Sequence, residues 1–112
     1  MVDENRFQIF KMQADICKTM SDPKRLMIVH ELRLGELSVG ELTSRLGLPQ
    51  ANISQHLSLM RKRGVVTTRR EGTTIFYRLA SEKIAEACDI VRCVLAEQLE
   101  GNKKLAKLLD AA

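Results

Sequence analysis

Aromatic side chains are scarce in this sequence, which has three phenylalanines, one tyrosine and no tryptophan among its 112 residues. Hydrophobic residues still make up 45% of the chain, so a core must be built from leucine, isoleucine, valine and methionine. Because 29% of the residues are charged, the composition predicts a folded soluble protein rather than a disordered one. The length suits one domain that spans residues 1–112.

Long apolar runs and catalytic motifs are missing as well. No stretch approaches the length of a membrane span, and the residues from Met1 to Arg6 lack the apolar segment of a signal peptide. We therefore expect a cytoplasmic protein with no membrane partner. The sequence has no nucleophile beside a base, no glycine-rich phosphate loop and no motif of paired carboxylates, which argues against an enzyme.

Positive charge is concentrated in one segment of the chain. Residues 1–49 contain 7 basic and 7 acidic side chains, and residues 79–112 contain 5 basic and 6 acidic ones. Residues 50–78 contain 6 basic side chains and 1 acidic one, so the formal charge of +4 comes from this segment. A neutral protein with a single basic segment has a place where a polyanion can bind.

The basic segment begins with a predicted helix that has two opposed faces. Ile53, Leu57 and Met60 form an apolar stripe, and neutral polar groups that can read base edges in a major groove crowd its first half. A preceding helix is also predicted, because a capping box at Ser38 marks its start and Gly47 marks its end. The two predicted helices make residues 38–63 a helix-turn-helix. The residues expected to contact DNA here are Gln50, Asn52, Ser54, Gln55, His56, Arg61 and Lys62.

A predicted wing follows at residues 65–79. The segments from Val65 to Arg70 and from Thr73 to Leu79 are rich in β-branched residues, and a hairpin turn is expected at Glu71 and Gly72. The alternative is a small sheet that only covers the core, with its arginines in solvent. The wing residues expected to contact DNA are Arg69, Arg70 and Thr73.

The helices predicted at residues 7–20 and 82–100 carry apolar arcs too broad for a surface helix. Two copies related by a two-fold axis would bury these arcs and would place two reading helices about one DNA turn apart. The alternative is that both arcs close one monomeric core. The residues expected at the dimer interface are Phe10, Cys17, Ile84, Cys88, Val91 and Leu95.

Four segments together carry a resemblance to a known family. They lie at residues 21–28, 37–42, 52–57 and 70–77, and the last two contain a Ser-x-His-Leu element and an Arg-Glu-Gly hairpin. Over roughly residues 8–100 the chain resembles the ArsR/SmtB repressors of bacteria and archaea. The resemblance implies a mostly α (α+β) winged helix-turn-helix of about five or six helices with a two-stranded hairpin. It also implies a homodimer that occupies double-stranded operator DNA and leaves it when an inducer arrives.

None of the usual metal sites of that family can be formed here. Metal-sensing relatives have a Cys-x-Cys pair where this chain has Ser38 and Gly40, and another family site needs histidines on the last helix, which has only Asp89. Three thiols remain as a possible inducer site, for a soft metal or metalloid ion such as arsenite or for an oxidant. In this interpretation Cys17 pairs with Cys88 or Cys93.

The cysteines also have a simpler interpretation. Cys17 and Cys88 lie on apolar stripes, as buried structural thiols do, whereas Cys93 falls on the polar face of its helix. A standing disulfide is not expected in a cytoplasm. Lys24 and Arg25 have two interpretations as well, as phosphate contacts or as a solvated first turn.

The sequence thus predicts a DNA-binding transcriptional regulator. The alternative is a winged-helix module for protein interaction or dimerisation that does not bind DNA. The polar cluster of the reading helix and the wing arginines argue against it, because an interaction surface would favour exposed aromatics.

Overall fold

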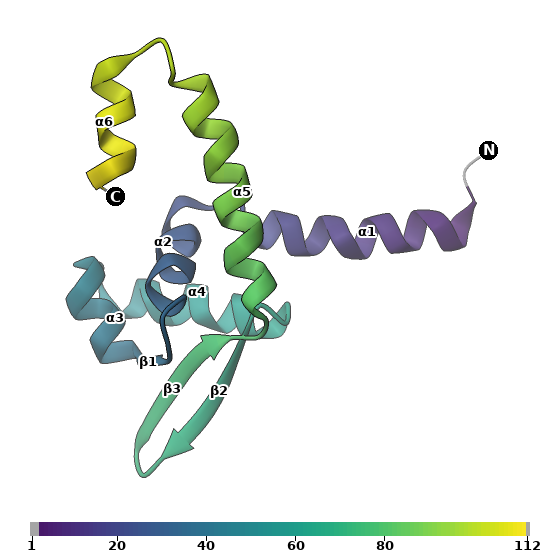
Figure 1. Ribbon diagram of the computed structural model, residues 1–112. Helices are drawn as coiled ribbons and strands as arrows, with labels where there is room; N and C mark the ends of the chain where they lie inside the picture. The colour runs from purple at the N-terminus through teal and green to yellow at the C-terminus, as the bar shows by residue number, and fades with distance from the viewer. Residues whose placement is uncertain (1–2, 112) are drawn as a thin grey trace.

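The computed structural model describes residues 3–111 and has six helices and three strands in that part of the chain. The small sheet is antiparallel, and its two longer strands follow the pair of helices at residues 39–62, which confirms a mostly α winged architecture (Figure 1). The elements are α1 (Glu4–Thr19), α2 (Pro23–Leu32), β1 (Leu37–Ser38), α3 (Val39–Leu46), α4 (Gln50–Lys62), β2 (Val66–Glu71), β3 (Thr74–Leu79), α5 (Glu82–Gln98) and α6 (Lys103–Ala111).

The core lies between α2, α3, α4 and the base of the sheet. Its side chains are aliphatic apart from one methionine, as the scarcity of aromatic residues predicts. Each helix contributes the stripe that faces the others, because apolar residues at helical spacing fall on one side. The buried hydrophobic residues are Ile28, Val29, Leu32, Leu37, Leu42, Ile53, Leu57, Met60, Val65 and Val66.

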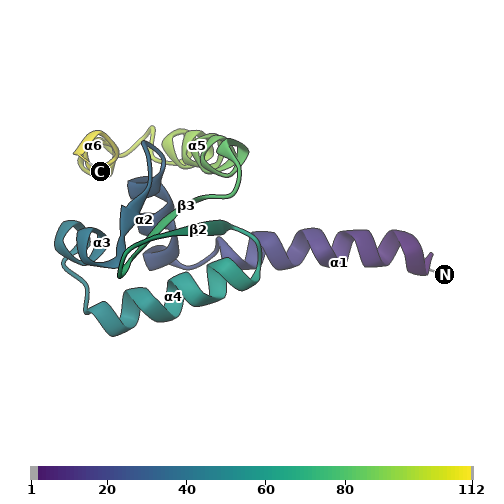
Figure 2. The same cartoon turned by 90° about the horizontal axis from the view of Figure 1, so that it is seen from below.

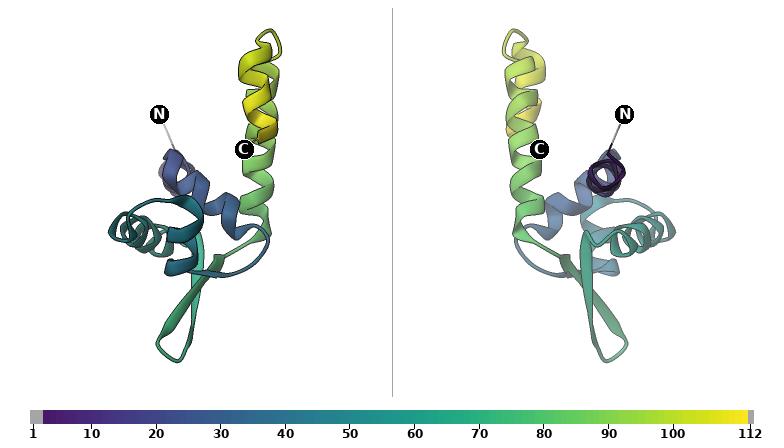
Figure 3. Two further views of the ribbon diagram at one scale, coloured as in Figure 1. Left: turned by 90° about the vertical axis from the view of Figure 1, so that its left-hand side faces the viewer. Right: turned by 90° about the vertical axis from the view of Figure 1, so that its right-hand side faces the viewer.

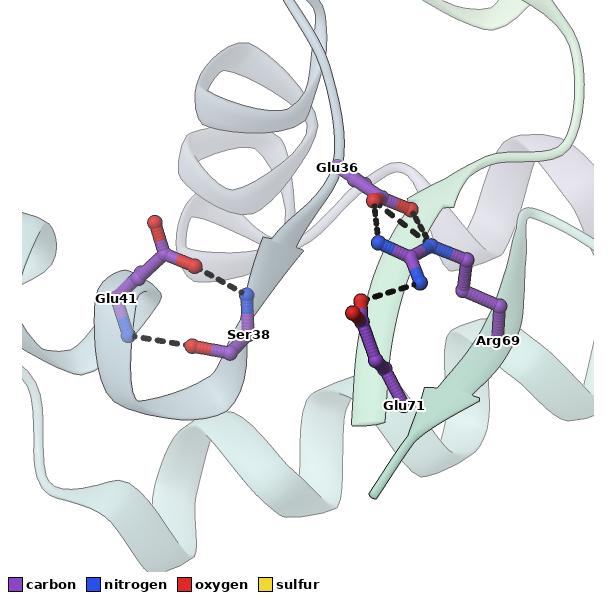
Figure 4. Close-up of polar contacts among 5 residues, drawn as sticks. All are labelled: Glu36, Ser38, Glu41, Arg69 and Glu71. Carbon is purple, nitrogen blue, oxygen red and sulfur yellow. Dashed lines mark hydrogen bonds and ion pairs between the residues drawn. The ribbon is translucent and has the colours of Figure 1, made fainter. Parts of the chain in front are cut away.

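The bounds of α3 are set by local sequence signals. The Ser38 hydroxyl accepts a hydrogen bond from the Glu41 backbone N–H at 3.1 Å, and the Glu41 carboxylate accepts one from the Ser38 N–H at 3.2 Å (Figure 4). This is the predicted capping box, and it is confirmed. At the other end Gly47 adopts a left-handed conformation with φ of 65°, which lets the chain turn sharply into α4.

The sheet differs from the sequence prediction in two details. Leu37 and Ser38 pair with β3 and make a third strand, so the order is β1-β3-β2 rather than a two-stranded hairpin. Glu71 pairs with Thr74, which places the turn at Gly72 and Thr73 and not at Glu71 and Gly72. Gly72 has φ of 62° at the first turn position, where a tight hairpin requires a positive value that glutamate tolerates poorly.

Helices α1, α5 and α6 extend away from this core. α1 begins at Glu4 rather than residue 7, because the Asp3 carboxylate caps it by accepting from the N–H groups of Asn5 and Arg6 at 2.8 and 3.2 Å. α1 projects to one side of the molecule (Figures 1 and 2), and α5 rises from the sheet with α6 turned back beside it (Figures 1 and 3).

The apolar arcs of these helices do not close a monomeric core. α5 and α6 contain no buried residue among those described, and in α1 only Thr19 is buried. The alternative of one compact monomer is therefore wrong. None of the helices between residues 3 and 111 is both long enough and apolar enough to cross a membrane. The large exposed side chains of α1 and α5 are Phe7, Ile9, Phe10, Met12, Ile16, Ile90, Val91, Val94 and Leu95.

Candidate nucleic-acid interface

Helix α4 presents one face to the core and the opposite face to solvent. Ile53, Leu57 and Met60 are fully buried, which orients Ser54 and Gln55 outward. The helix runs along one edge of the molecule, away from α5 and α6 (Figure 2). Its N-terminal half therefore offers short neutral hydrogen-bonding groups that nothing in the described chain covers, which is the surface a major groove can accept. The exposed members of the predicted set on α4 are Gln50, Ser54, Gln55, Arg61 and Lys62.

Two other members of the predicted set are half-buried beside α2. Lys24 Nζ donates to Asn52 Oδ1 at 3.3 Å, and Arg25 Nη1 lies 3.4 Å from His56 Nδ1. Asn52 and His56 are one helical turn apart, so both face the start of α2. Phosphate contacts and a solvated first turn are the two sequence-based interpretations of Lys24 and Arg25. In the structure Lys24 stays exposed in the first turn of α2, whereas Arg25 is half-buried, and both side chains contact α4.

Arg25 also reaches the end of α1. Its Nε donates to the Thr19 carbonyl oxygen at 2.5 Å, so one guanidinium contacts the last turn of α1 and the middle of α4. Asp22 caps α2 and keeps this corner in place by accepting from the N–H groups of Lys24 and Arg25 at 2.8 and 3.2 Å. The hydrogen bond from the Arg25 backbone holds the pKa of the Asp22 carboxyl below its usual range.

A second link joins α1 to the basic end of α4. Arg63 Nη1 lies 3.6 Å from the Asp15 carboxylate, while Arg61 and Lys62 are exposed in the last turn of α4. Positive charge is favourable at this end of a helix because of the helix dipole. The last turn thus combines one arginine that is paired within the chain with two basic residues that face solvent.

The wing carries an ion-pair cluster around Arg69. Its Nε lies 2.8 Å from both Glu36 carboxylate oxygens, its Nη2 contacts Glu36 Oε1, and its Nη1 lies 2.8 Å from Glu71 Oε2 (Figure 4). The guanidinium also lies over the Phe76 ring, 4.6 Å from the centroid. Arg69 therefore has partners on its own strand, on the neighbouring strand and in the segment before β1.

Each partner in this cluster stabilises the charged form of the other. The Arg69 guanidinium holds the pKa of the Glu36 carboxyl below its usual range, and the Glu36 carboxylate raises the pKa of Arg69 further. The sequence predicts that the positive charge of Arg69 contacts DNA, but in the fold the Glu36 and Glu71 carboxylates already balance this charge. Sequence reasoning missed Glu36, because the two-residue strand that brings it to the wing is too short to show a periodicity.

The three cysteines are free, and one lies on α1 and two on α5. Cys17 and Cys93 are exposed on α1 and α5, and Cys88 is half-buried against the core. Burial, with the neighbouring Asp89 carboxylate, raises the pKa of the Cys88 thiol, which disfavours the reactive thiolate. Within residues 3–111 no three histidine, cysteine or acidic side chains are grouped to hold a metal ion.

Comparisons with known proteins give a consistent result. The family described as "Bacterial regulatory protein, arsR family" matches residues 22–68, from the start of α2 into the wing. The biofilm growth-associated repressor of Agrobacterium fabrum is 45% identical over 89 residues, which cover 77% of this chain and 76% of that protein. The transcriptional activator HlyU of Vibrio cholerae is 43% identical over 76 residues, which cover 68% and 70%.

A solved structure supports the architecture over nearly the whole chain. The homodimeric winged helix-turn-helix DNA-binding domain of Mb0332 from Mycobacterium bovis has a TM-score of 0.79 and is 28% identical. The similarity covers 91% of this chain and 94% of that one.

Proposed function

Since this chain belongs to the arsR family of bacterial regulatory proteins and is a DNA-binding transcriptional regulator, we propose that it is a homodimeric repressor of a palindromic operator. The observation that carries the proposal is the division of α4 into a buried apolar stripe and an exposed polar face with a basic end. The protein is not an enzyme, because its relatives regulate transcription. Such a regulator works where the chromosome is, so we place it in the cytoplasm.

The homodimer is supported by the apolar surface that one copy leaves open. Phe10 and Val91 are 55% and 67% exposed on two helices that diverge from the core. A second chain is needed to bury these side chains. The similar Mycobacterium bovis domain is homodimeric. A two-fold axis between the copies would place the two α4 helices in major grooves about one helical turn apart on the same face of the DNA.

The roles within the interface follow from exposure and charge. Gln50, Ser54 and Gln55 are placed to read base edges, because they are exposed, neutral and able both to donate and to accept. Arg61 and Lys62 are placed to contact phosphates, which position the protein without specifying sequence. Asn52 and His56 contribute mainly by holding α4 against α2.

Operator binding can be tested with the DNA upstream of the protein's own gene. We expect the protein to shift the mobility of this DNA. Its affinity for the DNA should fall steeply as the salt concentration rises, because basic side chains displace counterions from phosphates. Gln55→Ala should reduce the preference for operator over random DNA, whereas Lys83→Gln, at the start of α5, should leave it unchanged. A purified protein without a salt-dependent shift would favour the alternative of an interaction module.

Repression rather than activation is the direction favoured by the more similar named relative. The Agrobacterium fabrum protein is called a repressor and the Vibrio cholerae protein an activator. A reporter joined to the upstream DNA distinguishes the two, since deleting the gene should raise expression if the protein represses. A fall in expression would show an activator that binds the same site.

For the inducer we propose a thiol-directed agent, either a soft ion such as arsenite or an oxidant, that acts where α1 and α5 meet a partner chain. Cys17 and Cys93 are exposed on those two helices, so thiols from two protomers can approach one another only in the dimer. Cys88 is the weaker candidate because the pKa of its thiol is raised. Binding there would act by favouring one arrangement of the two reading helices over another.

The test is a variant with all three cysteines changed to serine. We expect it to fold and to bind operator DNA, but to stay bound when arsenite or hydrogen peroxide releases the unmodified protein. If the variant is released normally, the cysteines are packing residues and the inducer is another molecule. If the triple variant instead stays bound, single substitutions of Cys17 and Cys93 show which thiols are required for release.

A further inference from the structure

The two neighbouring arginines of the wing point to opposite faces of the hairpin. Arg69 is paired with Phe76 and Arg70 with Ile75, and successive residues of a strand alternate between faces. A DNA backbone that contacts one face of the hairpin therefore meets only one of these two side chains. The sequence offers no reason to separate them, so the difference comes from what each side chain meets in the fold.

Arg69 meets two carboxylates. Glu36 and Glu71 both contact its guanidinium, so the cluster of one positive and two negative groups has a net negative charge (Figure 4). A phosphate that approached this cluster would be repelled unless it displaced Glu36. Displacement would break a two-oxygen contact with the guanidinium, which is the strongest geometry available to an arginine and a carboxylate.

The Glu36 contact joins the wing to the helix-turn-helix. Glu36 directly precedes β1, and β1 leads through Ser38 into the capping box of α3. β1 itself is only two residues long, and Ser38 pairs with Phe76, the residue beneath the Arg69 guanidinium. The ion pair therefore adds a side-chain link to the short backbone ladder that fixes the angle between wing and α3.

Arg70 lacks the ion pairs that hold Arg69. Its Nε donates to the Gly72 carbonyl oxygen at 3.2 Å, within the tip of the hairpin. Between residues 3 and 111 no carboxylate forms an ion pair with it. The side chain is exposed, and its full positive charge remains available to an anion outside the chain.

We propose that Arg70 is the phosphate-contacting residue of the wing and that Arg69 is a positioning residue, which Glu36 and Glu71 hold so that the wing keeps its angle to α3. This division of roles rests on the proposed DNA-binding function. Under it, loss of Arg70 removes a charge that binds DNA. Loss of Arg69 or of Glu36 releases the wing without removing a group that binds phosphate.

The salt dependence of DNA binding separates these roles in the full-length protein. Removing one basic group that binds a phosphate lowers the slope of log affinity against log salt by about 0.9, so R70Q should lower it by about 1.8 for a dimer with two wings. R69Q and E36Q should both weaken operator binding severalfold and leave the slope unchanged. The double variant should be no weaker than either single variant, since one link is broken in all three.

Hydrogen exchange of the wing amides provides a second measurement. R69Q and E36Q should speed exchange in β2 and β3, and R70Q should not, because only the first two remove the link to β1. K83Q, which removes an exposed charge at the start of α5, is the control and should change neither the exchange nor the salt slope. Melting curves show whether each variant is folded.

Several results would overturn the proposal. An R69Q slope that falls as far as that of R70Q would make Arg69 a phosphate ligand, and tighter binding by E36Q would make Glu36 a competitor of DNA. An R70Q slope equal to that of the unmodified protein would remove Arg70 from the DNA interface. If the unmodified protein itself shows no salt-dependent shift, the DNA-binding function fails, and that result is separate from these.

Discussion

The part of the molecule that we propose to face DNA and the part that we propose to face a second copy are built in different ways. Every buried hydrophobic side chain of the described residues lies between Ile28 and Val66, in α2, the helix-turn-helix and the small sheet with the residue before it. Helices α5 and α6 bury none of theirs. The first part has a complete core within one chain, whereas in the proposed dimer the second part would bury its exposed side chains against a partner chain.

Polar contacts join the two parts. Arg25 connects α1 to α4, Arg63 contacts Asp15 at 3.6 Å, and Arg33 of the α2 end contacts Asp89 of α5 at 2.6 Å. The two exposed ion pairs among these contacts, Arg63 with Asp15 and Arg33 with Asp89, contribute about 0–1 kcal/mol each. Ile84 and Cys88 of α5 also pack half-buried against the core, so apolar as well as polar contacts attach this helix.

The largest expected effect comes from a charge in the exposed apolar surface. Val91→Asp should abolish the dimer, because an unpaired carboxylate cannot be buried in an apolar interface without a large penalty. Val91 is 67% exposed in one chain, so the monomer should stay folded. Sedimentation should show a monomer, and operator binding should be abolished. Glu97→Gln on the same helix is the control, and a stable Val91→Asp dimer would contradict the prediction.

A substitution in the core tests the other part. Leu57→Ala should lower the free energy of unfolding by about 2–5 kcal/mol, because it leaves a cavity at a fully buried position of α4. Urea unfolding at fixed protein concentration measures the loss. The dimer dissociation constant, measured in buffer where the chain is folded, should not change. A changed dissociation constant would mean that the two parts are not separate.

The link between the parts is tested at Arg25. Arg25→Met keeps the aliphatic length but removes the hydrogen bond to the Thr19 carbonyl and the contact with His56. We expect a loss of about 1–3 kcal/mol in unfolding free energy, since a charged donor is removed, and a smaller preference for operator over random DNA. Lys24→Met, its neighbour, should have a smaller effect. An unchanged preference would show that α4 does not depend on this link.

A smaller effect is expected at the start of α3. Ser38→Ala removes the side-chain acceptor of the capping box and should lower the free energy of unfolding by about 1 kcal/mol. Thermal or urea unfolding measures it. Ser44→Ala, at an exposed position within the same helix, is the control. Equal losses for the two variants would mean that the cap does not stabilise α3.

The sequence predicts those features that depend on local signals. The capping box at Ser38, the left-handed Gly47 and the apolar stripe of α4 are each encoded within a few residues, and the structure contains all three. The third strand and the partners of Arg69 depend on residues far apart in the chain. Glu36 reaches the wing only because Leu37 pairs with Tyr77, and no local pattern encodes that pairing.

Exposure is harder to predict than helix position. Asn52 and Ser54 are two residues apart in a polar run and are equivalent in the sequence pattern, yet one contacts Lys24 and the other faces solvent. The difference depends on where α2 packs. Cys17 is similar, because its apolar stripe suggests burial, whereas the single chain exposes it. Both outcomes follow from tertiary packing, which residue spacing alone does not determine.

The smallest expected effect is on the acid stability of the wing link. Arg69 holds the pKa of the Glu36 carboxyl below the usual value of a glutamate, which is about 4.3. A carboxylate with a lowered folded-state pKa stabilises the fold above its unfolded pKa, and this contribution is lost as pH falls through the folded value. The difference in unfolding free energy between the unmodified protein and Glu36→Gln should therefore be largest near neutral pH and shrink towards zero under acid. Urea unfolding across that range measures it, with Asp110→Asn as the control. A difference that stays constant with pH would mean that the Glu36 charge does not stabilise the folded wing.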